Sequence, residues 1–328
     1  MTRPVFVSDE VAKQVLAWPA MIAKLRDVYA VEHPPFAGPP RTLARGKGIW
    51  MRTLTGVLPG GSVMGVKQFC FPRGRRVRYM ISLFDQESGE LKALLDANTI
   101  TAWRTGATTA VAVDRMARPG KARVAMLGSG AEARAHVRAI AAVRPIERVT
   151  VYSPTPARRE AYARMVVDEL GVPCRAVGSA REAVDGASLI VGATRTLDGK
   201  PALEGAWIEP GVLVASIGAT LPEHFEIDNA AIAKADLIVA DMPHEVMTET
   251  GCFQTAAKDG ITFEHKFVTL NALMLGLADD RLRAARYPMY RSVGQSLQDL
   301  AVAELAWREA ERRGLGVELP MELAIKSD

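Results

Sequence analysis

The sequence predicts an α/β protein built on a Rossmann-type, doubly wound parallel sheet, together with a separate α+β lobe. Short runs rich in β-branched residues alternate with helix-forming stretches from about residue 119 to 290, which is typical of a parallel sheet covered on both faces. A glycine-rich turn follows the first of these runs. At 328 residues the chain exceeds what one hydrophobic core usually organises. Two domains are therefore expected.

The α+β lobe is predicted from the segment that precedes the alternating region. VMGVKQFCF (63–71) and RVRYMISLFD (76–85) have the composition of strands, and ESGE (87–90) is a hairpin-turn sequence. A helix-rich stretch begins at Thr99 and ends at Pro119-Gly120, which is a strong stop signal for a helix. This mixture of a hairpin and a helix differs from the strand-helix alternation that follows it.

The expected strands of the parallel sheet follow one another at short intervals. They are RVAMLG (123–128), RVTVYS (148–153), PCRAV (173–177), SLIVGAT (188–194), VLVASIGAT (212–220) and DLIVAD (236–241). Helices are expected between them, including one from Ala157 to Leu170. Beyond residue 290, apolar residues at spacings of three and four predict a last amphipathic helix that returns to the first lobe. The expected domains are residues 119–290 and residues 1–118 plus 291–328.

Charge and cysteine content exclude several classes of protein. The 41 basic and 37 acidic residues are interspersed and give a net charge of +4, which disfavours nucleic acid and suits a small anionic ligand. Cys70, Cys174 and Cys252 are odd in number and far apart, so neither a disulfide framework nor a zinc cluster is expected. The five histidines form no paired metal-binding spacing. No metal is therefore predicted.

The sequence was also searched for membrane-spanning and signal segments. No window approaches 18 uninterrupted apolar residues, and the first residues lack a basic segment followed by an apolar one. A cytoplasmic protein without membrane attachment is expected.

The glycine-rich turn GSGAEA (128–133) fits the pattern G-x-G-x-x-G/A. The first glycine permits a tight turn, the second lets the backbone approach a pyrophosphate, and the third position stays small where helix meets sheet. The N-terminus of the next helix then offers unpaired N–H groups to phosphate. A plain strand-to-helix turn is the alternative, which the alternating context disfavours. The expected cofactor contacts here are Gly128, Ser129, Gly130, Ala131 and Glu132.

The end of the second predicted strand favours NADPH over NADH. An NAD site usually has an acidic residue there to accept the ribose 2′-hydroxyl, whereas this chain has Ser153, with Thr155, Arg158 and Arg159 just beyond. Hydroxyl and guanidinium groups suit a 2′-phosphate, which a carboxylate would repel. The alternative is that the two arginines are solvated residues at the start of a helix.

Further cofactor contacts are expected where other strands end, because ligands of such sheets bind outside the carboxyl ends of the strands. The residues assigned to these contacts are Thr194, Ile217, Gly218, Ala219 and Ser292.

Several motifs occur together in one order along the chain. They are GVKQF (65–69), LFDQESGE (83–90), LLDANTITAWRTGATTA (94–110), MLGSGAEA (126–133), IGATLPEHFEID (217–228) and RSVGQSLQD (291–299). In this order they resemble the ornithine cyclodeaminase/mu-crystallin family. The resemblance implies a first lobe that contacts substrate and forms a homodimer, with the Rossmann domain inserted before a returning C-terminal helix. It also implies chemistry at a carbon–nitrogen bond next to a carboxylate.

The resemblance further implies substrate-binding residues. In cyclodeaminases two arginines and a lysine surround the substrate carboxylate, and the matching residues are Arg41, Lys67 and Arg104. Guanidinium groups bind carboxylates bidentately, and a lysine adds a movable charge. The alternative for Lys67 is an outward-facing side chain, and the alternative for Arg104 is a structural salt bridge. For Arg41, the neighbouring residues give little indication of a role. Lys67 and Arg104 are also the expected catalytic residues.

One motif departs from the family pattern. Cyclodeaminases carry an aspartate in a G-x-D-x-P turn, needed for proton transfer during deamination and ring closure, but this chain has Thr220 in the turn 218–222. Threonine cannot act as a general base near neutral pH. Its hydroxyl can still orient a substrate or water, so Thr220 remains a catalytic candidate.

Three functions follow from these features. The first is an NADPH-dependent reductase of α-imino acids, either cyclic, such as pyrroline- or piperideine-2-carboxylate, or acyclic, with Lys67 as the proton donor. The second is an ornithine cyclodeaminase with bound NAD, which Thr220 and Ser153 disfavour. The third is a mu-crystallin-like, NADPH-dependent ligand-binding protein, against which the presence of Lys67 and Arg104 argues.

Overall fold

The computed structural model describes residues 3–72, 76–194, 196, 200–321 and 323–324. The chain forms two compact units, Met1–Arg104 with Gln295–Asp328 as unit 1 and Thr105–Gly294 as unit 2. The first border falls inside helix α3 (Asn98–Met116), before the Pro119-Gly120 stop at which the sequence placed it. The second lies a few residues beyond the expected border at residue 290.

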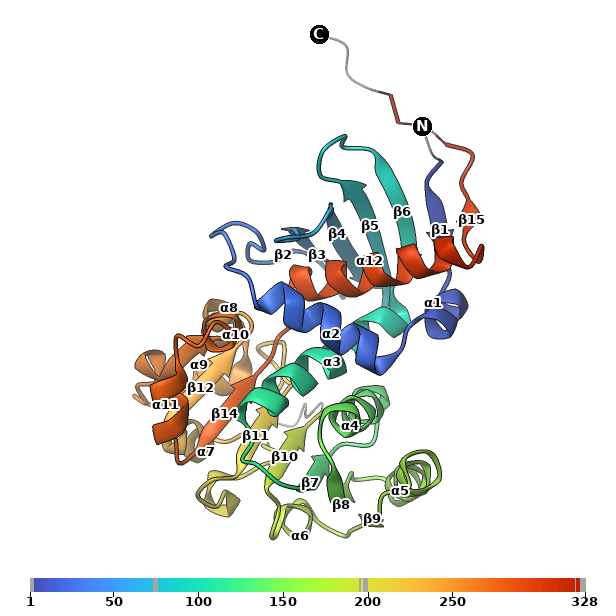
Figure 1. Ribbon diagram of the computed structural model, residues 1–328. Helices are drawn as coiled ribbons and strands as arrows, with labels where there is room; N and C mark the ends of the chain where they lie inside the picture. Colours follow the sequence, from blue (N-terminus) through green and yellow to red (C-terminus); the bar gives the residue numbers. More distant parts are fainter. Residues whose placement is uncertain (1–2, 73–75, 195, 197–199, 322, 325–328) are drawn as a thin grey trace. The chain divides into compact units, whose positions relative to one another are not determined.

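Unit 1 contains a seven-stranded sheet in the order β15-β1-β6-β5-β4-β3-β2 (Figure 1). Its strands are β1 (Val5–Val7), β2 (Thr42–Gly46), β3 (Ile49–Val57), β4 (Val63–Phe71), β5 (Arg78–Asp85), β6 (Leu91–Asp96) and β15 (Val317–Glu318). Strands β2 to β6 form an antiparallel meander, and β1 joins β6 in parallel. The sequence predicted β4 over its full length, because its apolar run is long and bounded by glycine and proline.

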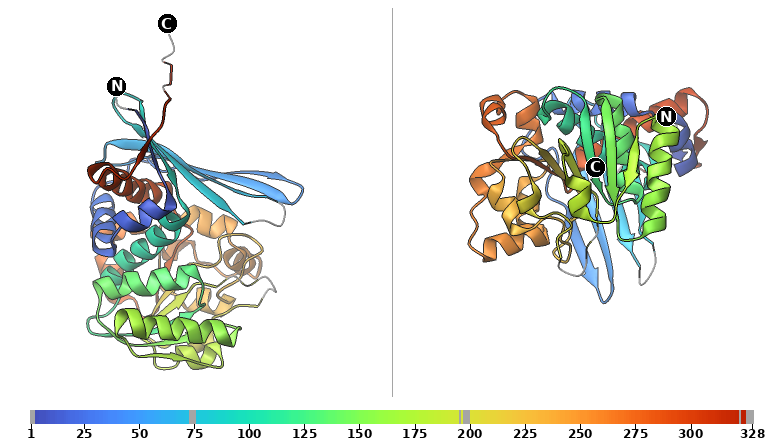
Figure 2. Two further views of the ribbon diagram at one scale, coloured as in Figure 1. Left: turned by 90° about the vertical axis from the view of Figure 1, so that its right-hand side faces the viewer. Right: turned by 90° about the horizontal axis from the view of Figure 1, so that it is seen from below.

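Helix α12 (Ser296–Arg312) lies along one face of this sheet, as Figures 1 and 2 show. Helices α1 (Asp9–Val15) and α2 (Trp18–Tyr29) pack against its other side, so most of its first three turns is buried. A Cβ at Gly56 would stand 2.8 Å from Ser296 Oγ, and one at Gly65 would stand 3.0 Å from Leu300 Cδ2. The two glycines therefore let the helix approach β3 and β4 closely. Helix α12 thus belongs to unit 1.

Unit 2 contains an eight-stranded sheet in the order β13-β12-β14-β11-β10-β7-β8-β9, in which every pairing is parallel. The strands are β7 (Ala122–Leu127), β8 (Ile146–Tyr152), β9 (Cys174–Ala176), β10 (Leu189–Gly192), β11 (Leu213–Ser216), β12 (Leu237–Ala240), β13 (Phe267–Thr269) and β14 (Pro288–Arg291). The Rossmann-type prediction is confirmed. The sequence did not predict β13 and β14, which are only three and four residues long.

Helices connect the strands of unit 2. They are α4 (Ala131–Val143), α5 (Pro156–Leu170), α6 (Ala180–Val184), α7 (Asn229–Lys234), α8 (Pro243–Glu249), α9 (Gly251–Lys258), α10 (Leu270–Met274) and α11 (Asp279–Ala284), with 3-10 turns η1 (Gly205–Trp207) and η2 (Glu264–Lys266). The chain runs outward from β7 through β8 to β9 and then returns to β10 on the other side of β7. This reversal makes the carboxyl ends of β7 and β10 the expected ligand crevice of the sheet.

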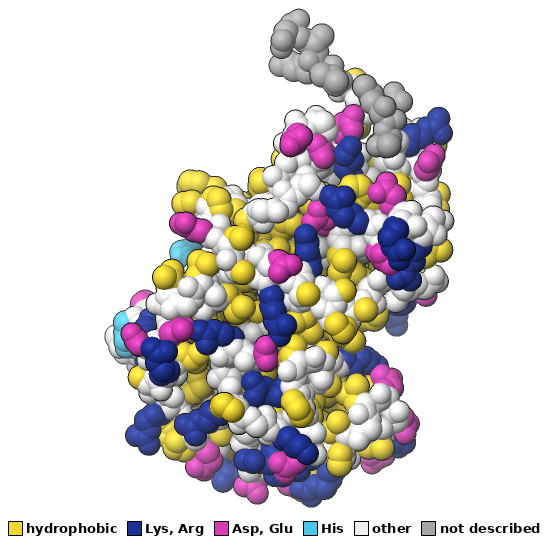
Figure 3. All heavy atoms as spheres, in the orientation of Figure 1, with side chains coloured by type: hydrophobic (Ala, Val, Ile, Leu, Met, Phe, Trp, Pro, Cys, Tyr) yellow, Lys and Arg dark blue, Asp and Glu magenta, His cyan; other side chains and the backbone are white. Residues whose placement is uncertain are grey.

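The surface carries both signs of charge. On the face shown in Figure 3, lysine and arginine side chains are interspersed with aspartate and glutamate. Among the described residues, no helix is both long enough and apolar enough to cross a membrane.

Candidate active site

Lys67 lies near the middle of β4 on the side of the sheet that faces α12. Its Nζ atom is 2.8 Å from Oδ1 and 2.7 Å from Oδ2 of Asp299, which lies in the first turns of α12. Lys67 is 2% exposed and Asp299 is 0% exposed. A lysine buried to this degree requires a partner, because an unpaired charge is costly to remove from water. Lys67 therefore points into the protein, as the sequence predicted.

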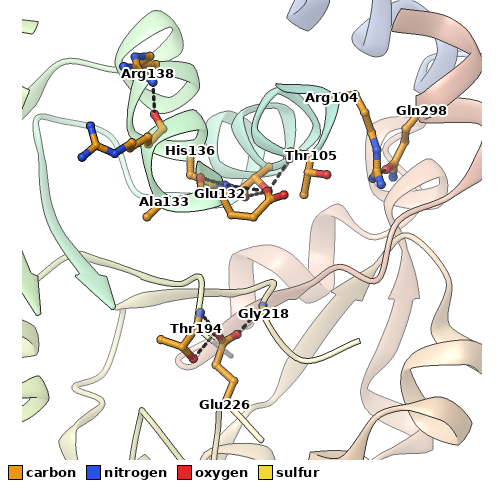
Figure 4. A network of polar contacts seen from close by, with 12 residues as sticks. Arg104, Thr105, Glu132, Ala133, His136, Arg138, Thr194, Gly218, Glu226 and Gln298 are labelled. Carbon is orange, nitrogen blue, oxygen red and sulfur yellow. Dashed lines mark hydrogen bonds and ion pairs between the residues drawn. The ribbon is translucent and has the colours of Figure 1, made fainter. Parts of the chain in front are cut away.

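Arg104, in α3, binds the same carboxylate. Its Nε atom lies 2.7 Å from Asp299 Oδ1, and its Nη1 donates to Gln298 Oε1 at 2.6 Å (Figure 4). The Gln298 amide donates to the Tyr29 hydroxyl at 2.8 Å, and that hydroxyl donates to Gln295 Oε1 at 3.2 Å. The salt bridge considered for Arg104 from the sequence exists, and it joins Arg104 to Lys67 through Asp299.

The environment of Lys67 lowers the pKa of its ammonium group to about 7. Burial is the largest cause, and the positive charges of Arg104 and Arg41 lower this pKa further, while the negative charge of Asp299 opposes them. Arg41, directly before β2, is thus close enough to act electrostatically on Lys67. A lysine with this pKa can give up or accept a proton near neutral pH.

The residues Arg41, Lys67, Arg104 and Asp299 are called the lysine cluster below. It combines three basic side chains with one carboxylate, so it carries excess positive charge, which is larger when Lys67 is protonated. Such a cluster attracts an anionic ligand and has a proton available beside it.

In unit 2, the glycine turn has the geometry that dinucleotide binding requires. Gly128 directly follows β7 with φ of 113°, and a Cβ there would clash with the carbonyl oxygen of Ala193. Gly130 is the N-cap of α4, and in the described part of the chain no heavy atom lies within 4 Å of the place where its Cβ would stand. Ala131 and Glu132 form the first turn of α4. The open helix N-terminus therefore fits a pyrophosphate.

The next turn carries the residues assigned to the 2′-phosphate. Ser153 directly follows β8, and its hydroxyl is 2.8 Å from that of Ser129. Arg159 donates to the carbonyl of Ser153 at 2.9 Å, so this arginine holds the turn. Thr155 is the N-cap of α5, and Arg158 lies exposed in the first turn of that helix. The end of β8 thus presents hydroxyl and guanidinium groups.

The remaining cofactor candidates lie in turns that follow other strands of unit 2. Thr194 follows β10, and Ile217, Gly218 and Ala219 follow β11, where the Ile217 N–H donates to the Gly192 carbonyl at 2.9 Å. Ser292 follows β14, and its hydroxyl donates to Asp241 at 2.6 Å. Thr220 is half-buried in the turn after Ala219. These candidates all follow carboxyl ends of strands in one parallel sheet.

Sequence reasoning missed the buried charged residues that hold these candidates. They are Asp299 in unit 1, and Glu226, Asp241 and Arg291 in unit 2, each at most 5% exposed. All four occur inside sequence segments that had been singled out as motifs or strands. Asp241 ends the apolar run 236–241, and a charge in such a run indicates a buried polar partner. Asp299, Glu226 and Arg291 lie in motifs with several other polar residues, so these segments carry no comparable signal for them.

The fold and the glycine turn define a dinucleotide-binding class of protein. The model of the ornithine cyclodeaminase/mu-crystallin family matches residues 71–313. The chain belongs to this family.

Known relatives include named imine reductases. The chain is 29% identical to a Delta(1)-pyrroline-2-carboxylate reductase of Bacillus cereus over 244 residues, which is 74% of each protein. It is 29% identical to the ketimine reductase mu-crystallin of Mus musculus over 227 residues, 69% of this chain and 68% of the relative.

A solved structure shares the whole fold. It is the Delta(1)-pyrroline-2-carboxylate reductase of Thermococcus litoralis in complex with NADH and L-proline, with a TM-score of 0.88 and 24% identity. The match covers 96% of this chain and 100% of that one.

The contacts of Asp299 predict how the lysine cluster titrates. Replacing Asp299 by Asn removes the negative charge that raises the pKa of Lys67, so this pKa should fall below about 7. The measurement is a ¹³C NMR titration of lysine-labelled protein, with the Lys67 signal assigned by its loss in Lys67→Met. Glu304→Gln is the matched control, because Glu304 is a buried carboxylate of the same helix paired with Lys24 instead. A Lys67 pKa that stays unchanged in Asp299→Asn would contradict the electrostatic role of Asp299.

Proposed function

We propose that this protein is an NADPH-dependent reductase of the C=N bond of small α-imino acids. The observation that carries the proposal is the lysine cluster, in which a lysine with a pKa of about 7 shares a buried carboxylate with Arg104 and feels the charge of Arg41. The relatives named as pyrroline-2-carboxylate and ketimine reductases support it. The substrate class comprises cyclic imines such as pyrroline- or piperideine-2-carboxylate and acyclic imino acids.

The substrate carboxylate is assigned to the two arginines of the cluster. Arg41 and Arg104 offer planar, permanently charged donors, and guanidinium groups bind carboxylates bidentately. The contacts of Arg104 with Asp299 and Gln298 fix its orientation before substrate arrives. A bound carboxylate also balances the positive charge that otherwise lowers the pKa of Lys67, so substrate binding favours the protonated lysine.

The proton is assigned to Lys67. Its Nζ atom donates to the substrate nitrogen, because a protonated C=N bond accepts hydride far better than a neutral one. When bound, the reduced nicotinamide supplies the hydride that the substrate carbon accepts. Asp299 keeps the lysine oriented through both carboxylate oxygens. With a pKa of about 7, the lysine regains a proton from water near neutral pH.

An ornithine cyclodeaminase activity is disfavoured by the turn after β11. This turn carries Thr220 rather than a carboxylate, and a threonine hydroxyl cannot remove a proton near neutral pH. Hydride transfer to an imine does not need a base at this position, so the reductase function is compatible with threonine.

NADPH is the proposed cofactor rather than NADH. The support is the end of β8, where the Ser129 and Ser153 hydroxyls and the exposed Arg158 stand in place of a carboxylate. Each of these groups can donate a hydrogen bond to a 2′-phosphate.

A homodimer formed through unit 1 is the proposed assembly. Alternation along β3 places Met51 and Val57 on the side of the sheet opposite to Lys67, and these side chains are 42% and 46% exposed. Met64, directly across from Val57, lies on the same side. Exposed apolar side chains gathered on one sheet face are typical of a protein interface.

The function is tested by following NADPH absorbance at 340 nm with a panel of cyclic and acyclic imino acids. The proposal predicts NADPH consumption equal to the amino acid formed. Ammonia release from ornithine without net NADPH consumption would indicate a cyclodeaminase instead. NADPH binding without turnover of any imine would indicate a ligand-binding protein.

Lys67 variants test the assigned proton donor. Lys67→Ala should lower kcat and kcat/KM together by about 10² or more, as expected when a positioned proton donor is lost. Lys67→Arg keeps the charge but not the titratable amine, so it should recover substrate binding better than turnover. Lys92→Ala is the control, because Lys92 lies in β6 of the same sheet, with β5 between it and β4, and pairs with Glu90. An increase in KM alone would make Lys67 a carboxylate anchor and not the proton donor.

Cofactor preference is tested at the end of β8. The unmodified protein should bind NADPH more tightly than NADH by about 1.5–3 kcal/mol for each charge-assisted hydrogen bond to the 2′-phosphate. Arg158→Ala should weaken NADPH and leave NADH nearly unchanged, and Ser153→Asp should shift the preference toward NADH. Arg164→Ala, an exposed position two turns further along α5, is the control. Dissociation constants follow from fluorescence titration, and equal affinities in the unmodified protein would contradict the assignment.

A further inference from the structure

Glu226 is a fully buried carboxylate to which the proposed chemistry gives no task. It lies in the loop between β11 and α7 and is 0% exposed. Its Oε1 accepts from the N–H of Thr194 at 2.7 Å and from the hydroxyl of Thr194 at 2.9 Å (Figure 4). Its Oε2 accepts from the hydroxyl of Ser216 at 2.7 Å and from the N–H of Gly218 at 3.0 Å.

These four donors match an ionised carboxylate. Each of the two oxygens has two acceptor sites, and each receives two hydrogen bonds. A buried carboxylate is tolerated when its acceptors are satisfied in this way, and losing one such partner leaves donors without hydrogen bonds. The carboxylate therefore links the turn after β10 to the turn after β11.

Two glycines make room for this carboxylate. A Cβ at Gly192, the last residue of β10, would stand 2.7 Å from Cδ of Glu226. A Cβ at Gly218 would stand 2.5 Å from Oε1 of the same side chain. Atoms do not approach this closely without a shift, so glycine at both positions allows the two turns to close around Glu226.

Arg291 binds carbonyl groups of the same segment, residues 216–219. This arginine of β14 is fully buried, and it donates to the carbonyls of Ser216 at 2.9 Å and Ser292 at 2.8 Å and to the carbonyl of Ala219. Glu226 binds N–H and hydroxyl groups of residues 216–218, while Arg291 binds carbonyls of residues 216 and 219. Buried charged side chains therefore bind both the donor groups and the carbonyl groups of the segment before Thr220.

We propose that Glu226 is a positioning residue for the nicotinamide half of the cofactor. It acts by holding the turns that carry Thr194 and the segment 217–219 in one conformation, without itself touching the ligand. This proposal rests on the proposed dinucleotide site, in which the turn after β7 receives the pyrophosphate and the turns after β10 and β11 extend the crevice beyond it. Loss of Glu226 should therefore affect the two halves of the cofactor unequally.

The test compares NADPH with adenosine 2′,5′-bisphosphate, which contains only the adenosine end. Glu226→Gln keeps the side-chain shape but replaces one oxygen by an NH2 group. This NH2 group cannot accept hydrogen bonds from the donors that it faces. NADPH should bind about tenfold or more weakly to this variant, because two buried donors lose their acceptor. Adenosine 2′,5′-bisphosphate should bind within about twofold of the unmodified protein. Isothermal titration calorimetry measures both, and imine-reduction assays should show a higher KM for NADPH.

Asp228→Asn is the matched control. Asp228 is two residues away, and its Oδ1 accepts from the N–H groups of Gly205 at 2.8 Å and Ala231 at 2.7 Å, so it also holds backbone in unit 2. This variant should lower thermal stability, but it should not change the affinity for NADPH relative to that for adenosine 2′,5′-bisphosphate. Should Glu226→Gln fail to fold, Ser216→Ala removes one hydrogen bond to Oε2 and should weaken NADPH alone by about threefold.

The outcomes separate the two proposals. Equal weakening of both ligands by Glu226→Gln, or unchanged binding of both, would overturn the positioning role. Failure of the unmodified protein to bind NADPH would overturn the cofactor assignment itself.

Discussion

The pairing of Lys67 and Arg104 with one buried carboxylate is the constraint on which the substrate side of this structure depends. Burying two cations in unit 1 is costly unless they are paired, and Asp299 pairs with both. Asp299 lies 232 residues further along the chain than Lys67. Helix α12 must therefore return to the first lobe and lie close to β3 and β4, which Gly56 and Gly65 permit. The return of α12 to unit 1 and the buried position of Lys67 thus depend on each other.

In unit 2, buried charged side chains likewise bind polar groups, but most of these groups belong to the backbone. Its turns carry polar groups that must keep a fixed direction, and the buried charges of Glu226, Asp241 and Arg291 satisfy them. Charged hydrogen-bond partners hold such turns more firmly than neutral ones. In both units, a charge without a direct chemical role arranges the groups that are proposed to meet the ligand.

Much of this was predictable from local sequence, and the rest depends on contacts between distant residues. The strand β4 and the glycine turn at Gly128 are encoded by neighbouring residues, through apolar runs and a required positive φ. Lys67 was expected to face inward because it lies in the GVKQF motif, through which the chain resembles its family. The partner of Lys67 was not predictable, because Asp299 meets Lys67 only after the chain has folded. In the same way, Glu226 is bound by Thr194, which follows β10, and by Ser216 at the end of β11.

The central claim is that Lys67 supplies the proton for imine reduction, and the pH dependence of kcat/KM tests it most directly. With a Lys67 pKa of about 7, the reduction of Δ1-pyrroline-2-carboxylate should slow as pH rises above about 7, because the lysine loses its proton. Lys67→Arg stays protonated throughout, so that part of the decline should disappear and only the ionisation of the substrate should remain. Identical pH profiles for the unmodified protein and Lys67→Arg would contradict the account.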